Sequence, residues 1–345
     1  MTHPRWRGVF AAIPYAVVAM AFSGFSPLAT GAAAERADLY VRPAVAPAPA
    51  DNPLTPARAE LGKSLFFDPR LSGSNWISCA TCHNPGLGWS DGLPKSVGHG
   101  MKPLRRGSPS ILNVAFNPIQ MWDGRSPNFE MQALIPIETP GIMAQSMPAL
   151  VKKLEPIQGY RQLFEKAYPG EGISGSTIVK ALASFQRTVL STVSPFDRWR
   201  KGNGQAVSAS AKRGFALFEG KANCVKCHSG FNFTDNGFHN IGLEIVSDDD
   251  DPGRFGQRKV PIAKGAFKTP SLRDVALTAP YMHHGIYATL EAVVEHYDRG
   301  GVVKDNVSPN IVPLNLSTQD KADLVAFMKS LTGTPARVVL PHLPQ

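Results

Sequence analysis

The pattern Cys-x-x-Cys-His occurs twice in this chain, at residues 79–83 and 224–228. It is the attachment motif of a c-type haem, in which two thiols bond to the haem vinyl groups and the histidine coordinates the iron. The two motifs use all four cysteines of the chain. Two disulfides, or one zinc site made of the four cysteines, are the alternatives, but neither explains a histidine directly after each pair. The sequence therefore predicts two covalent haem groups, bound through Cys79, Cys82, His83, Cys224, Cys227 and His228.

Residues 1–34 have the features of a secretory signal peptide. Arg5 and Arg7 form a basic start, an apolar stretch covers residues 9–22, and small residues at 32–34 offer a cleavage site. The apolar stretch is shorter than the about 20 residues of a membrane span, and an uncleaved anchor is the alternative. We therefore expect an exported, periplasmic protein with no stable membrane span in the mature chain.

The net charge of the chain is moderately basic. It is +9 in total and becomes +7 without residues 1–34, which contain Arg5 and Arg7 but no acidic residue. This charge favours an acidic protein partner. We find no basic cluster with interleaved aromatic residues, so nucleic acid is not an expected partner.

The remaining chain of about 310 residues suits two domains, with one haem motif in each. We expect cytochrome c-like domains at residues 35–200 and 201–345. A faint repeat supports the duplication, because Gly-Lys-Ser-Leu-Phe at 62–66 and Gly-Phe-Ala-Leu-Phe at 214–218 precede the two motifs. With 30 prolines and 31 glycines, the fold is expected to be mainly α-helical and rich in loops.

Apolar spacing and end signals predict five helices. One begins at Thr55-Pro56, three cover residues 176–190, 209–219 and 289–298, and the last begins at Ser317. Ser317 and Asp320 form a variant of the capping box. The apolar face of this last helix is formed by Leu324, Phe327, Met328 and Leu331.

Beyond its haem motifs, the sequence resembles the bacterial dihaem cytochrome c peroxidase family, and within it the MauG-like branch. The resemblance covers nearly the whole mature chain. It rests on blocks that occur in the family's order: Leu-Phe-Phe-Asp-Pro-Arg-Leu-Ser at 65–72, Val-Gly-His-Gly at 97–100, Pro-Ser-Ile-Leu-Asn at 109–113, Trp-Asp-Gly-Arg at 122–125, Thr-Pro-Ser-Leu-Arg at 269–273 and Leu-Thr-Ala-Pro-Tyr-Met-His at 277–283. It implies a first haem that reacts with hydrogen peroxide, a second that transfers electrons, and Trp122 as the residue that couples them.

The resemblance also assigns a peroxide pocket at the first haem. Gln132 and Pro136 match two residues that line it in the family. The family's glutamate falls on Ile142, which cannot move a proton between the peroxide oxygens. Glu138 either replaces it or is a solvated loop carboxylate. His99 matches the histidine that covers the first iron in many resting members, or else it is a loop histidine.

At the second haem, the family position of the sixth iron ligand falls on Tyr297. MauG has tyrosine there, whereas classical peroxidases have methionine. A phenolate is a hard, anionic donor that favours oxidised iron. Tyr297 could instead pack in the core, with the ligand supplied by Met282, Met328 or Met101.

The family also holds a calcium ion between its haem domains. Thr278 and Pro280 match its two carbonyl ligands, whereas its asparagine position falls on Gly107, which has no side-chain oxygen. A calcium ion is therefore expected here only if water or another carbonyl completes its oxygen shell.

Three functions are compatible with these features. The first is a MauG-like enzyme that uses hydrogen peroxide to form a high-valent dihaem state and oxidises a residue, preferably tryptophan, on a secreted partner protein. The second is a peroxidase that takes electrons from a small cytochrome or copper protein, and the third is a dihaem electron carrier. Tyr297 and Ile142 favour the first, His99 favours the second, and Gln132 and Pro136 argue against the third.

The identity of the partner depends on the tryptophans. MauG has a surface tryptophan two residues before its second motif, and this position falls on Ala222, which argues against methylamine dehydrogenase as the partner. Other MauG-like enzymes, including the MbnH type, oxidise tryptophan in a different secreted partner. The other tryptophans of the mature chain either relay charge or only pack in the fold; they are Trp76, Trp89 and Trp199.

The motif count leads to a direct prediction. The mass of the intact mature protein should exceed that of its polypeptide by two haem groups, because each motif holds one group covalently. Mass spectrometry of the purified protein checks this, and a mass with one haem or none would contradict the assignment.

Overall fold

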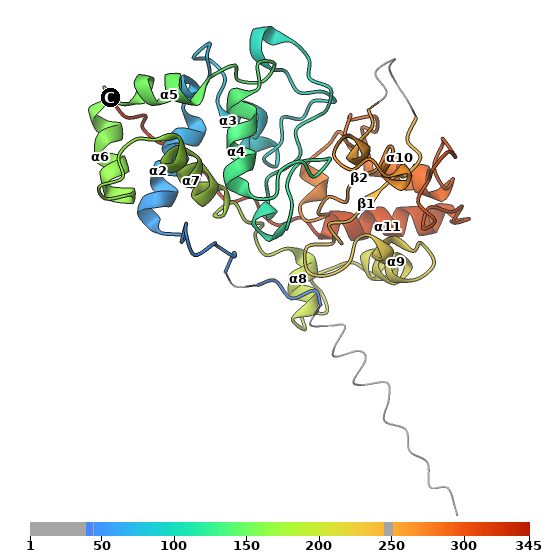
Figure 1. Ribbon diagram of the computed structural model, residues 1–345. Coiled ribbons are helices and arrows are strands. Elements are labelled where there is room, and N and C mark those ends of the chain that lie inside the picture. Colours follow the sequence, from blue (N-terminus) through green and yellow to red (C-terminus); the bar gives the residue numbers. More distant parts are fainter. Residues whose placement is uncertain (1–38, 44, 245–250) are drawn as a thin grey trace, which may run out of the picture. The chain divides into compact units, whose positions relative to one another are not determined.

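The computed structural model describes residues 39–43, 45–244 and 251–345, so the predicted signal peptide lies outside the described residues. The structure is mainly helical with long loops, as expected (Figure 1). Its α-helices are α2 Pro56–Phe67, α3 Cys79–Cys82, α4 Phe129–Glu138, α5 Met147–Leu154, α6 Gln158–Ala167, α7 Gly175–Gln186, α8 Pro195–Arg200, α9 Ala209–Glu219, α10 Leu290–Asp298 and α11 Thr318–Ser330. The strands β1 Phe238–His239 and β2 Phe267–Lys268 pair in antiparallel fashion. None of the described helices has the length and apolar character needed to span a bilayer.

Helices α2, α4, α6 and α7 form a first group around the first haem motif (Figure 1). Thr55 caps α2 by accepting a hydrogen bond from the Arg58 backbone N–H, and Pro56 occupies the first turn. Leu61 and Leu65 of α2 are fully buried against α7. This packing places the end of α2, and the chain that follows it, beside the first motif.

A second group, formed by α9, α10 and α11, packs around an aromatic core. Phe218 of α9 and Phe327 of α11 are almost completely buried, with ring centroids 4.9 Å apart. Edge-on and tilted aromatic contacts of this kind add to the burial of apolar area. The core also includes Phe196 and Trp199 of α8, so the hydrophobic packing groups α8 with the second motif.

The repeated segment before each motif has a structural reason. A Cβ atom at Gly62 of α2 would meet the Ala181 carbonyl of α7, and one at Gly214 of α9 would meet the Asp323 carbonyl of α11. Each glycine therefore lets two helices cross with their backbones in close contact. The same crossing, used twice, precedes both motifs.

The two ends of the described chain pack across the sequence midpoint. Tyr40 lies in the second core, with its ring 5.2 Å from that of Phe233. At the other end, Gly159 of α6 donates its N–H to the Gln345 carbonyl, and Arg70 donates to the Pro344 carbonyl. Each end of the described chain therefore contacts the opposite half of the sequence, and the division into domains at residue 200 stays a prediction.

Most of the predicted helix boundaries are confirmed. Helix α9 covers the predicted residues 209–219 and ends at Gly220, and α11 begins after Ser317, whose side chain caps the Asp320 N–H. Helix α7 ends at Gln186, earlier than the predicted residue 190. The sequence analysis missed α3, α4, α5, α6 and α8, partly because Pro136 lies inside α4 and prolines suggest loops.

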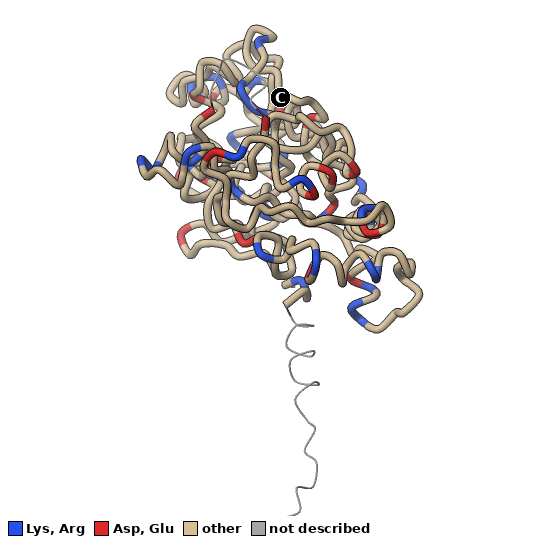
Figure 2. Tube along the Cα trace, turned by 90° about the vertical axis from the view of Figure 1, so that its right-hand side faces the viewer, with Lys and Arg blue, Asp and Glu red and all other residues tan. Residues whose placement is uncertain are grey.

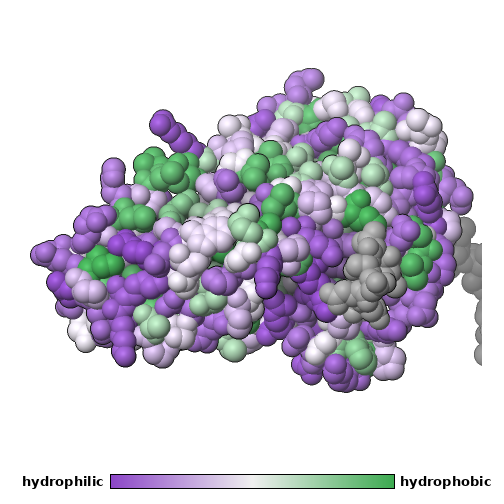
Figure 3. Space-filling model, turned by 90° about the horizontal axis from the view of Figure 1, so that it is seen from above, coloured by the Kyte–Doolittle hydropathy of each residue, from purple (hydrophilic) through white to green (hydrophobic). Residues whose placement is uncertain are grey.

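The surface carries charges of both signs. Lysine and arginine residues are interspersed with aspartate and glutamate along the trace (Figure 2). On the face seen in Figure 3, hydrophobic residues lie in small groups between hydrophilic ones. Exposed apolar side chains of this kind are normal for a protein surface.

The crossing glycines make a prediction about stability. Gly62→Ala and Gly214→Ala should each lower the free energy of unfolding by about 1–3 kcal/mol, because the added methyl group overpacks a backbone crossing. Chemical unfolding of the haem-loaded protein, followed by circular dichroism, measures the loss. Gly204→Ala is the control: this exposed glycine has no atom within 4 Å of its Cβ position. Equal effects at all three positions would contradict the role of the crossings.

Candidate haem-binding site

The first motif lies at the end of the short helix α3. The His83 backbone N–H donates to the Cys79 carbonyl at 2.9 Å, so the motif closes on itself as a helical turn. The imidazole Nδ1 of His83 lies 3.2 Å from the Trp89 carbonyl oxygen, to which it can only donate. Burial lowers the pKa of His83, and the ring is therefore neutral with its Nε2 left to coordinate a metal.

The second motif repeats this arrangement on a short 3₁₀ helix at Cys224–Lys226. The His228 N–H donates to the Cys224 carbonyl at 2.9 Å, and its Nδ1 lies 2.9 Å from the Phe233 carbonyl oxygen. Burial also lowers the pKa of His228. In both motifs a backbone carbonyl orients the imidazole, as is usual for a metal-binding histidine.

The cysteines exclude the two alternative interpretations of the motifs. All four are free, so no disulfide joins them. Within the described residues, the four thiols do not gather into a metal-binding group. Burial raises the pKa of Cys79 and of Cys224 to about 12.

One cavity of about 890 Å³ connects the two motifs. Its lining includes Cys79, Cys82, His83, Cys224, Cys227 and His228, together with Trp122, Gln132 and Tyr297. This volume is near the upper end of the range for cofactor sites. Paired thiols beside a neutral, oriented imidazole, repeated at two places in one cavity, are the donor set that two c-type haems require.

The part of the cavity near the first motif contains most of the predicted peroxide pocket. Gln132, Pro136 and Ile142 all line it. The Gln132 side-chain oxygen is buried and has no hydrogen-bond partner among the described residues, so it can accept one from a ligand. Since Pro136 has no N–H, the carbonyl of Gln132 also lacks its usual helix hydrogen bond.

Two of the predicted pocket residues are not part of the cavity lining. Glu138 is exposed, and its carboxylate accepts a hydrogen bond from the Met147 N–H at the start of α5. Glu138 therefore caps the start of α5 and is not part of the cavity lining. His99 does not line the cavity either; its backbone N–H donates to Gly141, and its buried Nδ1 has no described partner.

Tyr297 of α10 lines the cavity near the second motif. Burial raises the pKa of its phenol, and the thiols of Cys224 and Cys227 raise it further. A phenolate at this position thus needs a nearby positive charge, such as a metal ion. Of the alternative ligands, Met282 and Met328 line the cavity, whereas Met101 is 66% exposed.

Trp122 connects the two halves of the cavity through its contacts. The indole N–H donates to the Gly107 carbonyl at 3.0 Å, and the ring makes an edge contact with His283. Its backbone carbonyl accepts a hydrogen bond from the Lys268 N–H of β2 at 2.8 Å. Trp122 is consequently held by residues from the chain segments before and after the second motif.

The predicted calcium site has a limited donor set. Thr278 and Pro280 line the cavity, as the carbonyl ligands are expected to. A Cβ atom at Gly107 would lie 2.9 Å from the Pro94 carbonyl oxygen, so an asparagine side chain has little room there. These positions supply no carboxylate, and calcium binding stays a prediction.

The remaining tryptophans differ in environment. Trp76 is 45% exposed, three residues before the first motif. Trp89 packs on Phe66, and Trp199 packs in the second core. Ala222, at the position of the surface tryptophan of MauG, is 4% exposed.

Fold and site together define a dihaem c-type cytochrome with a peroxide-reacting architecture. The family model for di-haem cytochrome c peroxidase matches residues 56–205, and the cytochrome c model matches residues 211–332. The methylamine utilization protein MauG of Methylorubrum extorquens is 49% identical over 88% of this chain and 86% of its own. The chain belongs to the di-haem cytochrome c peroxidase family, in its MauG-like branch, and is a haem-dependent oxidoreductase.

Two further relatives cover most of the chain. The cytochrome c551 peroxidase of Pseudomonas aeruginosa is 37% identical over 85% of this chain and 83% of its own. The crystal structure of a MauG-like protein associated with microbial copper homeostasis has a TM-score of 0.79 at 33% identity, over 85% of this chain and 93% of that one.

The sequence analysis missed one charged residue of the cavity lining, Lys268. Lys268 is 8% exposed and lines the cavity beside Cys227 and His239. It directly precedes the block at residues 269–273, but a lysine in a loop-rich segment normally indicates solvent exposure. The burial of Lys268 becomes clear only from its position on β2 in the structure.

The position of Tyr297 leads to a spectroscopic prediction. Tyr297→Phe should change the absorption and electron paramagnetic resonance spectra of the second haem and shorten the lifetime of its oxidised state, because the oxygen donor is removed. Tyr281→Phe is the control, since Tyr281 lines the same cavity. Unchanged spectra in the Tyr297 variant would assign the sixth ligand to another residue.

Proposed function

We propose that this protein uses hydrogen peroxide to oxidise a side chain, preferably a tryptophan, on another protein exported to the periplasm. The observation that carries the proposal is the single cavity lined by both motifs, with Tyr297 near the second and Ile142 near the first. The identity with MauG and the likeness to a MauG-like structure support it. When bound, the two haems supply the redox chemistry that takes two oxidising equivalents from peroxide and transfers them to the side chain that is oxidised.

The residues near the first motif have separable roles in this proposal. His83 is held in its neutral form by the Trp89 carbonyl and presents Nε2 to the cavity. Gln132 offers an unpartnered, buried oxygen as a hydrogen-bond acceptor for the peroxide hydroxyl. Ile142 and Pro136 exclude water from this part of the cavity, and neither can accept a proton.

The residues near the second motif suit storage of an oxidising equivalent. Tyr297 would supply an anionic oxygen donor, which stabilises a more positive metal centre. Trp122 is assigned to electron passage between the two parts of the cavity, because its ring contacts the lining and its backbone is fixed on both sides. The target can then be oxidised at the protein surface and need not enter the cavity.

A peroxidase that oxidises a small cytochrome or copper protein is the second candidate. The relationship to the cytochrome c551 peroxidase of Pseudomonas aeruginosa favours it. Either candidate needs peroxide and a redox partner, and they differ in what happens to the partner. The partner gains an oxygen atom in the first case and only loses an electron in the second.

Incubation of the dihaem protein with peroxide and exported candidate partners separates these functions. We expect mass spectrometry to find one oxygen atom added to a tryptophan of the partner, only when enzyme and peroxide are both present. Trp122→Phe should slow this reaction at least about tenfold, or ~1.4 kcal/mol in the barrier, because the electron path is interrupted. Trp199→Phe, in the second core, should leave the rate unchanged. An unmodified partner, with rapid oxidation of a reduced cytochrome, would establish the second candidate.

A further inference from the structure

Lys268 is a buried lysine with no acidic partner. Its side chain extends from β2 beside the second motif, and the residue is 8% exposed. The ammonium group donates to the Thr269 carbonyl at 3.1 Å and to the Asn236 side-chain oxygen at 3.3 Å. Both acceptors are neutral, and Lys268 forms no ion pair within the described part of the chain.

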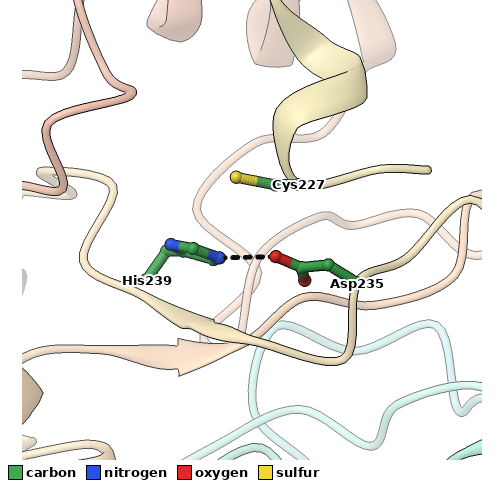
Figure 4. Close-up of side chains that lie close together, drawn as sticks. All are labelled: Cys227, Asp235 and His239. Carbon is green, nitrogen blue, oxygen red and sulfur yellow. Dashed lines mark hydrogen bonds and ion pairs between the residues drawn. The ribbon is translucent and has the colours of Figure 1, made fainter.

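The carboxylate whose charge acts on Lys268, that of Asp235, is already occupied. Asp235 accepts a hydrogen bond from His239 Nε2 at 2.8 Å (Figure 4). It accepts another from the Gly237 N–H at 2.7 Å. The hydrogen bond to Asp235 is the largest cause that raises the pKa of His239. Asp235 is therefore already paired with His239 and is not available as a counter-ion for Lys268.

Asp235 and His239, together with Cys227, could be mistaken for a metal site. Cys227, Asp235 and His239 bring their ligand atoms within 4.8 Å of one another (Figure 4). However, the sulfur of Cys227 is used for haem attachment, and His239 Nε2 is hydrogen-bonded to Asp235. The cluster therefore offers no free set of metal ligands, and the buried ammonium group of Lys268 beside it favours an anion over a cation.

The cavity itself indicates which anion this is. Lys268 lines it together with Cys227, His228 and His239. A buried cation without a counter-ion is unfavourable, and burial lowers the pKa of Lys268 to about 8. A c-type haem attached at Cys224 and Cys227 brings two carboxylate side chains, the propionates, into this same cavity.

We propose that Lys268, supported by the His239–Asp235 pair, is a positioning residue that binds a propionate carboxylate of the second haem. Its ammonium group completes an ion pair that the polypeptide alone leaves open. The positive charge also stabilises the reduced state of that haem and so raises its reduction potential. The backbone N–H of Lys268 donates a hydrogen bond to the Trp122 carbonyl, so the same residue links the haem carboxylate to the bridging tryptophan. This inference rests on the two-haem composition and is independent of the partner oxidised.

Redox titration of the purified dihaem protein tests the proposal without peroxide or partner. Lys268→Met should lower the midpoint potential of the second haem by at least a tenfold change in its reduction equilibrium, which is 59 mV for a one-electron couple. The potential of the first haem serves as an internal reference. Lys268→Arg should keep the potential near its original value, because the charge is retained.

Resonance Raman spectra provide a readout that a merely structural lysine would not affect. The propionate bending bands of the second haem should shift in Lys268→Met and in Lys268→Arg, because the hydrogen bond to the carboxylate is lost or changed. Lys259→Met removes the same charge from an exposed position nearby and should change neither the bands nor the potential. Mass spectrometry verifies two haems in each variant, and Lys268→Gln replaces Lys268→Met if the latter fails to fold.

Two results would overturn the proposal. The first is an unchanged potential and unchanged propionate bands in a folded, two-haem variant without the lysine charge. The second is a midpoint potential of the original protein that varies with acetate or chloride concentration at constant ionic strength, since Lys268 would then bind a free anion. Failure of the partner assay above would leave either result unaffected.

Discussion

The rest of this structure depends on how two histidines are held. In each haem motif, a backbone carbonyl fixes Nδ1 of the imidazole, and burial keeps the ring neutral. Nε2 is then the ring nitrogen left for a metal, and both histidines line the cavity together with the paired cysteines. Both carbonyls, of Trp89 and Phe233, belong to short loops directly after their motifs. The helices that precede the two motifs are packed by the same glycine-mediated crossing in each half.

The cavity explains why two such units are joined in one chain. Its lining comes from segments before and after both motifs, and Trp122 is fixed by Gly107 on one side and Lys268 on the other. Two cytochrome c-like units that merely lay side by side would have no such shared lining. The chain ends add to the connection, because Tyr40 packs in the second core and Gln345 bonds to α6. A redox pathway through the protein requires this kind of fixed geometry.

Polar groups in and around the cavity divide into satisfied and unsatisfied ones. Asp235 and His239 satisfy each other, and Glu138 is used as a helix cap outside the cavity. The side-chain oxygen of Gln132 lacks a partner, and Lys268 lacks a counter-ion. Buried polar groups are normally paired, so unpaired ones in a cofactor cavity indicate where ligands bind. Near the first motif this indicates a hydrogen-bonding ligand, and near the second a carboxylate.

The sequence alone determined the two haem attachments, the mainly helical fold and the family, because covalent motifs and ordered blocks leave a direct record in residue order. It also located α2, α9 and α11, whose capping residues and apolar faces are local signals. Only the tertiary structure decided that Glu138 and His99 do not line the cavity, that Trp76 is exposed, and that Lys268 is buried. These properties depend on which loops pack together over long sequence separations. Neither the spacing of apolar residues nor the local turn signals contain that information.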